Sequence, residues 1–187
     1  MRLDIIILIV IIFIISYLIA IYNKFAKLRA GIEGGWADIE VQLKKRYNLV
    51  PNLVEIVKGY AKHEKETLEK LVEARNSALN ANSIEEKAKA NAKLNQALGS
   101  IFALAEAYPN LKANQNFINL QNQLSEIEES IANARRYYNA VVRDYNAMLE
   151  SFPDQLIAKR FNYTKKPYFE LNESEREVVK SVPKVEF

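Results

Sequence analysis

A continuous apolar run near the N-terminus constrains this chain more than any other feature. Residues 5–21 read IIILIVIIFIISYLIAI, seventeen residues without a charge. As a helix the run is about 25 Å long at 1.5 Å per residue, close to the ~30 Å hydrocarbon core of a bilayer. Tyr17 and Tyr22 lie toward one end, where aromatic rings prefer the headgroup level. We therefore predict a retained transmembrane anchor from Ile5 to Ile21.

Two other interpretations of the run fit less well. A cleavable signal peptide has an apolar region of about 7–15 residues and then a small-residue cleavage site. Here the run is longer, and Asn23, Lys24 and Phe25 follow it. A buried core helix is a further alternative, but such helices are rarely apolar on every side.

The basic residues beside the anchor predict its orientation. Only Arg2 precedes the run, whereas Lys24, Lys27 and Arg29 follow it closely. Lys and Arg accumulate on the cytoplasmic side of a membrane span. We therefore expect the N-terminus outside and the rest of the chain in the cytoplasm.

Composition limits what the remaining chain can do. The protein has 187 residues, a net charge of +3 and no cysteine. A charge this balanced gives no sign of nucleic-acid binding, for which a clustered basic stripe is expected. The lack of cysteine excludes disulfides, cysteine metal sites and thiol catalysis. With only five Gly and five Pro, we expect long helices and few loops.

The segments after the anchor form three expected parts. Residues 1–22 contain the anchor, and residues 23–35 form a juxtamembrane link with glycines at 31, 34 and 35. Because glycine weakens a helix by about 1 kcal/mol, we expect a break or flexible joint in this link, with a continuous helix as the alternative. Residues 36–153 form a helical bundle, and residues 154–187 form an irregular tail whose aromatic residues pack back and whose end is extended or disordered.

Apolar spacing predicts an all-α, up-and-down antiparallel bundle of three to four long helices. Pro51 interrupts the first of these helices, but the apolar spacing stays in phase across it, so we expect a kinked helix or two helices there. The bundle has four long helices if the first one divides near Pro51 or Gly59. Ser83 and Glu86 fit a capping box at the start of a later helix. The apolar residues of two stripes are spaced three or four positions apart. They are Trp36, Ile39, Leu43, Tyr47, Val50, Val54, Val57 and Ala61 in the first stripe, and Phe117, Leu120, Leu124, Ile127, Ile131, Ala134, Tyr138, Val141, Tyr145, Met148 and Phe152 in the last.

No motif in the sequence assigns a reaction, and we expect no enzyme activity and no cofactor. His63 is the only histidine and lacks the second histidine that a zinc helix requires, so we expect it to be exposed. Glu126, Glu128 and Glu129 flank the buried position Ile127, and we expect them to face solvent rather than to form a catalytic pair.

Two groups of residues are candidates for contact with lipid or a partner. Lys44, Lys45 and Arg46 form the densest basic run, which could meet anionic headgroups, although a solvated helix face is the simpler interpretation. Asn114 and Asn116 lie at a helix start, where capping or turn bonding explains them as well as binding does. Three further residues, Tyr137, Tyr138 and Tyr145, fit core aromatic positions.

Several stretches together resemble the LemA family of bacterial membrane proteins, over nearly the whole chain. They are WADIEVQLKKRYNLVPNLV from Trp36, VKGYAKHE from Val57, EAYPNLKANQNF from Glu106, LQNQL from Leu120 and ARRYYNAVVRDYN from Ala134. The resemblance implies a single-pass anchor with the N-terminus outside, a helical bundle in the bacterial cytoplasm and no established enzyme activity. One relative of the family, a magnetosome protein, is tied to building a membrane compartment.

The chain departs from the family pattern at three places. Members often have Asp where this chain has Glu40 and Asn48, and Gly-Phe where it has Arg160-Phe161. We expect a membrane-anchored, non-enzymatic scaffold or adaptor at the bacterial cell envelope, in contact with the bilayer and with a protein partner or a second copy. The alternatives are a membrane-remodelling or lipid-surface-binding protein and, less favoured, an enzyme or metal-binding bundle.

Overall fold

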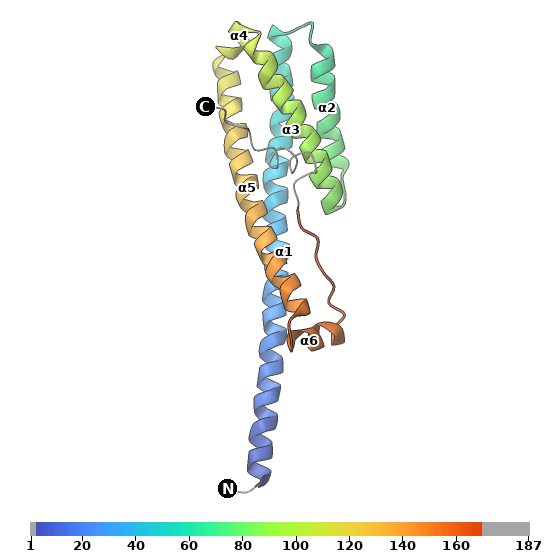
Figure 1. Cartoon of the computed structure of the whole chain (residues 1–187). Helices are drawn as coiled ribbons and strands as arrows, with labels where there is room; N and C mark the ends of the chain where they lie inside the picture. The colour runs from blue at the N-terminus through green and yellow to red at the C-terminus, as the bar shows by residue number, and fades with distance from the viewer. Residues whose placement is uncertain (1–2, 170–187) are drawn as a thin grey trace, which may run out of the picture. The chain divides into compact units, whose positions relative to one another are not determined.

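The computed structural model describes residues 3–169, and all regular structure within them is helical (Figure 1). The helices are α1 (Leu3–Tyr60), α2 (Lys65–Asn80), α3 (Ile84–Glu106), α4 (Pro109–Lys112), α5 (Gln115–Glu150) and α6 (Asp154–Arg160). The predicted all-α class is confirmed, and four of the six helices are long. The predicted end of the tail, beyond residue 169, lies outside the described residues.

The chain divides into two compact units, and α1 and α5 contribute residues to both. The first unit joins Met1–Asp38 with Ala134–Tyr168, and the second is built mainly from Ile39–Asn133. We refer to them as the first unit and the second unit. Each is described separately below.

The expected break in the glycine-containing link is wrong, because α1 runs through residues 23–35 without interruption. In the first unit, Gly31 and Gly35 lie one helical turn apart against α5. A Cβ atom added at Gly35 would lie 3.0 Å from Cδ1 of Tyr137, and one added at Gly31 would lie 3.2 Å from Cγ1 of Val141. Small residues at this spacing allow two helix backbones to approach closely. These two glycines therefore serve helix packing rather than flexibility.

The first long helix also continues through Pro51 and ends only at Tyr60. In an α-helix the carbonyl of residue 47 accepts from the N–H of residue 51, which proline lacks. Nε of Arg75 on α2 donates to that free Tyr47 carbonyl oxygen at 2.8 Å. The lost backbone bond is thus replaced from a neighbouring helix. The division comes beyond Gly59, between Tyr60 and Lys65, which gives four long helices.

The core of the second unit follows the predicted apolar stripes. The first stripe is buried at Ile39, Leu43, Val50 and Val57. The predicted capping box is confirmed, since the Ser83 hydroxyl accepts from the Glu86 N–H at 3.1 Å and the Glu86 carboxylate accepts from the Ser83 N–H. Further core side chains come from the other helices of this unit: Leu68, Leu71, Leu94, Leu98, Ile101, Leu111, Phe117, Leu120 and Leu124.

The stripe on α5 is confirmed over most of its length but shifts toward its end. In the first unit Tyr138, Tyr145 and Met148 are buried, and Val142 rather than Val141 is fully buried beside them. Tyr145 and Met148 lie beyond Val142 and keep the predicted spacing, so this exchange is local. Phe152, predicted as the last core residue, is 77% exposed.

The predicted irregular tail contains a helix, α6, and this part of the prediction is wrong. Two of its aromatic residues, Phe161 and Tyr163, do pack back as expected, onto α1 within the first unit. The ring of Phe161 lies 5.2 Å from that of Tyr22, and the ring of Tyr163 lies 5.1 Å from that of Phe25. Asn162 takes the left-handed φ of 53° that turns the chain after α6, a conformation Asn tolerates well.

Candidate functional site: a buried arginine network

Among the described residues of the second unit, one charged side chain is buried, that of Arg46, which is 1% exposed. The predicted exposed run of Lys44, Lys45 and Arg46 is therefore divided. Lys44 and Lys45 are exposed, whereas Arg46 points inward and cannot reach a lipid headgroup. Successive helix positions are about 100° apart, so a run of three charges cannot all face water on a half-buried helix.

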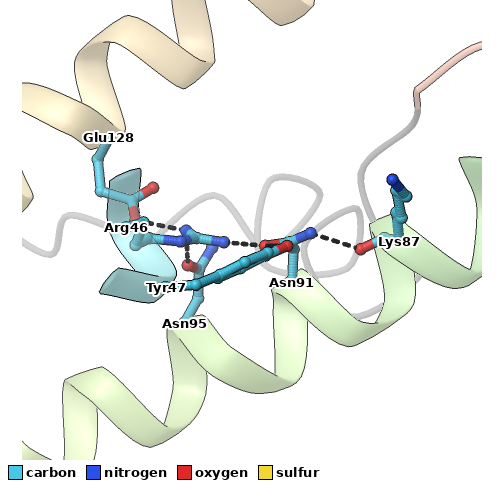
Figure 2. A network of polar contacts seen from close by, with 6 residues as sticks. All are labelled: Arg46, Tyr47, Lys87, Asn91, Asn95 and Glu128. Carbon is cyan, nitrogen blue, oxygen red and sulfur yellow. Dashed lines mark hydrogen bonds and ion pairs between the residues drawn. The ribbon is translucent and has the colours of Figure 1, made fainter. Parts of the chain in front are cut away.

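The guanidinium group of Arg46 joins three helices (Figure 2). Its Nη1 donates to Oδ1 of Asn95 at 2.6 Å and to Oε1 of Glu128 at 2.5 Å. Its Nη2 donates to Oδ1 of Asn91. Nε is buried and meets no acceptor among residues 3–169. Asn91 and Asn95 lie on α3 and Glu128 lies on α5, so Arg46 links α1 to both of these helices.

Tyr47 and Asn91 extend the network into the core (Figure 2). The Tyr47 hydroxyl donates to Oδ1 of Asn91 at 2.9 Å, and Nδ2 of Asn91 donates to the Lys87 carbonyl at 2.8 Å. Burial raises the pKa of the Tyr47 hydroxyl above its usual 10.0, although the bond to Asn91 and the charge of Arg46 oppose this. The phenol therefore stays neutral and acts as a donor at physiological pH.

The chemistry of this cluster suits holding helices together better than catalysis. An arginine stays protonated in proteins and has no acceptor atom, so it cannot exchange protons with a substrate. Planar guanidinium groups do bind carboxylates and amide oxygens with strong directional preference. Lys87 adds an ion pair from α3 to Glu40 on α1, next to the cluster. The arrangement fixes the register of α1, α3 and α5.

The prediction for the three glutamates is wrong at one position. Glu126 and Glu129 are exposed, but Glu128 turns toward Arg46 and its side chain is 41% exposed. The helical pattern alone predicts that every neighbour of Ile127 is solvated. The signal that could have identified Glu128 is the lone arginine within the apolar stripe of α1, which requires an acid on a facing helix.

The remaining candidate residues lie apart from this network. Asn114 caps α5, since its Oδ1 accepts from the Phe117 N–H at 3.0 Å, and its Nδ2 donates to the Tyr60 hydroxyl at 2.8 Å. The capping interpretation of Asn114 thus holds. Asn116 is exposed, and His63 is exposed in the turn between α1 and α2.

The anchor prediction rests on α1, the one helix within residues 3–169 that is long and apolar enough to cross a membrane. All residues from Leu3 to Ala20 are exposed, including Ile5 and Tyr17. Ile21, the last predicted anchor residue, is buried within the first unit, and Tyr22 is exposed beside Phe161. The free apolar surface of the anchor therefore ends one residue earlier than expected.

An apolar groove on the second unit was not expected from the sequence. It lies between the end of α1 and the outer face of α2, has a volume of about 650 Å³, and has Val54, Ala61, Leu68 and Val72 among its lining. Charged side chains of both signs border it: Lys58, Lys62, Lys65, Glu69 and Glu73. Val72, part of the apolar pattern along the chain, remains exposed there. A groove of this kind suits an amphipathic helix.

A helical bundle joined to a long exposed apolar segment defines a class of membrane-associated helical proteins. The chain matches the LemA family over residues 35–187 and belongs to that family. This confirms the resemblance drawn from the sequence.

Individual relatives point the same way. The chain is 24% identical to the magnetosome protein MamQ of Magnetospirillum gryphiswaldense, over 83% of this chain and 66% of MamQ. It is 24% identical to magnetosome protein MamQ 2 of Paramagnetospirillum magneticum, over 83% of this chain and 67% of the relative. It is 23% identical to protein LemA of Metamycoplasma hominis, over 82% and 71%. The chain thus spans about two thirds of the length of its MamQ relatives.

Proposed function

We propose that this protein is a membrane-anchored, non-enzymatic scaffold that holds a helical bundle at the bacterial cell membrane and binds a protein partner there. One observation carries the anchoring. The side chains from Leu3 to Ala20 are exposed around the whole helix. Burying a side chain of this type in an apolar medium is favourable by roughly 1.5–3 kcal/mol. A lipid bilayer is the environment that satisfies all of them together.

The apolar groove between α1 and α2 supports the binding of a partner. Its floor of aliphatic side chains, bordered by lysines and glutamates, suits a helix whose apolar stripe is flanked by charges. A second copy of this chain is one possible source of such a helix. The hydrogen bond from Nε of Arg75 on α2 to the Tyr47 carbonyl on α1 supports the same role indirectly, since it ties together the two helices that form the groove.

Crosslinking in membranes tests this proposal. A photoreactive residue at Val72, in the groove, should form adducts that mass spectrometry identifies as a protein helix or as a second copy. The same residue at Asn122, an exposed position on α5 outside the groove lining, is the matched control. A chain that stays monomeric and free of adducts at Val72 in native membranes would contradict the scaffold role.

A second candidate is binding to the membrane surface, favoured by the exposed pair Lys44 and Lys45. Each basic residue near an anionic surface contributes about 1 kcal/mol. Changing both to Gln should then weaken recruitment of anionic lipid around the reconstituted full chain, and added salt should have the same effect. The matched control changes Lys89 and Lys93 on α3 to Gln. Equal lipid preference in both double variants would exclude this role for Lys44 and Lys45.

A further inference from the structure

The short helix α6 lies within the first unit beside the point where the exposed anchor ends (Figure 1). Two aromatic contacts fix this position: Phe161 packs on Tyr22 at 5.2 Å, and Tyr163 packs on Phe25 at 5.1 Å. Tyr22 follows directly after the apolar run. If the run crosses the hydrocarbon core, Tyr22 and whatever packs against it lie at headgroup level.

The segment that follows α6 is tied to α5, so α6 cannot swing freely. The Tyr138 hydroxyl donates to the Pro167 carbonyl at 2.9 Å. The Asn146 side chain donates to the Lys166 carbonyl at 2.9 Å and accepts from the Lys166 N–H at 2.9 Å. An ion pair joins Lys165 to Glu150. The chain returning from α6 is thus held at three places along α5.

Three large apolar side chains on and beside α6 are exposed. Phe152 is 77% exposed, Leu156 is 56% exposed and Phe161 is 49% exposed. Single exposed apolar residues are ordinary on protein surfaces. Three of them lie within ten consecutive residues, and one of the three, Phe161, packs on Tyr22 directly after the exposed apolar run.

Basic residues accompany these apolar side chains. Lys159 and Arg160 occupy the last turn of α6, and both are exposed. Lys24 and Lys27 are exposed on α1 just after the anchor. Apolar side chains with adjacent Lys and Arg are typical of segments that lie in the interface of an anionic membrane.

We propose that α6, with Phe152 and Phe161 at its ends, is a second membrane contact that inserts into the headgroup region of the leaflet from which the anchor emerges. Phe152, Leu156 and Phe161 enter the boundary with the acyl chains, and Lys159 and Arg160 meet anionic headgroups. The inference rests on the proposed anchoring. The occupant is lipid because Phe161 packs on Tyr22 where the anchor ends, and because Lys159 and Arg160 carry the charge opposite to that of an anionic leaflet.

Depth measurement with single cysteines tests the inference. The chain has no cysteine, so one residue at a time can be changed to Cys and labelled with a polarity-sensitive fluorophore. Phe152→Cys and Leu156→Cys are the test positions, because both side chains are exposed and their loss leaves the core intact. Ile11→Cys marks the anchor, and Arg143→Cys marks an exposed position on α5 in the same unit.

The labelled full chain is reconstituted into vesicles of phosphatidylcholine and phosphatidylglycerol. At positions 152 and 156 we expect blue-shifted emission and loss of intensity with lipids brominated near the headgroup end of the acyl chain. Position 11 should be quenched by deeply brominated lipid, and position 143 should resemble the label in water. Aqueous emission at 152 and 156 with a quenched position 11 would overturn this inference alone. An unquenched position 11 would overturn the anchoring itself.

The basic residues are tested separately. In the Leu156→Cys background, Lys159→Gln with Arg160→Gln should reduce the extra quenching that phosphatidylglycerol gives over pure phosphatidylcholine. Lys89→Gln with Lys93→Gln on α3 is the charge-matched control and should leave it unchanged. Extra quenching by phosphatidylglycerol that is equally large in both double variants would remove the headgroup role from Lys159 and Arg160.

Discussion

Arg46 carries a permanent charge, yet its side chain is almost fully buried. Desolvating a charge costs several kcal/mol, and a buried ion pair often contributes little net stability compared with apolar residues of the same shape. Its hydrogen bonds have strict geometry, however, and apolar packing alone permits slippage between helices. We infer that the network with Asn91, Asn95 and Glu128 selects one alignment of the helices, which apolar stripes alone do not define.

Truncating this side chain gives the first prediction. Arg46→Ala should lower the free energy of unfolding by about 3–5 kcal/mol, because it leaves the facing carboxylate and amides without their partner. Arg46→Met, which keeps the volume, should cost less. Lys44→Ala, at an exposed neighbouring position, should change stability by no more than about 0.5 kcal/mol. Urea unfolding of the full chain in detergent, followed by circular dichroism, measures all three. Equal losses for Arg46→Ala and Lys44→Ala would contradict the network.

Glu86 gives a prediction for pH. Hydrogen bonds from the N–H groups of Asn82 and Ser83 lower the pKa of the Glu86 carboxyl below its usual 4.5. The unfolded chain therefore binds the proton more tightly, so this carboxylate stabilises the fold above pH 4.5 and loses that effect as pH falls through its folded pKa. Glu86→Gln should unfold earlier than the wild type at neutral pH, and the difference should shrink in acid. Thermal unfolding of both proteins across that range measures it.

At the scale of elements, the continuity of α1 depends on a contact between two helices. Arg75 donates to the Tyr47 carbonyl that Pro51 leaves free. Arg75→Met should therefore lower the free energy of unfolding by about 1–3 kcal/mol, the cost of a buried acceptor without a partner. In a Pro51→Ala background the backbone N–H is restored, and the same change should cost much less. A double-mutant cycle measures this coupling. Additive effects of the two substitutions would show that Arg75 does not serve the interrupted helix.

The neighbouring glycines of α1 separate helix propensity from packing. Gly34 has open space at its Cβ position, whereas a Cβ at Gly35 would meet Tyr137 at 3.0 Å. Gly34→Ala should raise the free energy of unfolding by up to about 1 kcal/mol. Gly35→Leu should lower it by about 1–3 kcal/mol through overpacking. Denaturant titration of both variants in the same detergent decides; a stabilising Gly35→Leu would mean that α1 and α5 do not approach closely there.

Much of the helical pattern could be predicted because it depends on local chemistry. Apolar spacing gave the buried faces of α1 and α5, and the pair Ser83 and Glu86 gave the start of α3. The continuity at Gly35 and Pro51 could not be predicted, because it depends on Tyr137 and Arg75, which lie far away in sequence. A residue that disfavours a helix is tolerated there because a tertiary neighbour packs against it or bonds the backbone group that it leaves free.

The arginine network shows the same limit for the candidate site. In the sequence Arg46 follows two lysines. Only its position on the helix turns its side chain into the core, whereas Lys44 and Lys45 face solvent. Glu128 likewise has acidic neighbours on α5, and only its position on the helix turns it toward Arg46. Partners separated by many residues become neighbours through the packing of three helices, so the sequence can indicate that a buried Arg46 requires an acid on a facing helix but not that this acid is Glu128.

At the scale of the whole molecule, orientation across the membrane is the decisive property. The basic residues after the anchor predict the C-terminal side in the cytoplasm. A single Cys at Glu73, an exposed position on α2, should resist a membrane-impermeant maleimide in intact cells and react after lysis. Immunoblotting for a mass shift reads this directly. Labelling in intact cells would reverse the orientation and place the groove outside the cell.

The order of the two units along the sequence has a consequence for biosynthesis. The first unit joins Met1–Asp38 with Ala134–Tyr168, while the helices of the second unit come from the segment between them. On the ribosome the anchor emerges before the helices of the second unit. The first unit can close only when α6 and the residues after it have left the exit tunnel. The α1 half of the first unit, including Phe25 and Ile32, which are buried in the folded protein, therefore lacks its packing partner during most of translation. At that stage its apolar surface needs a chaperone or a membrane surface.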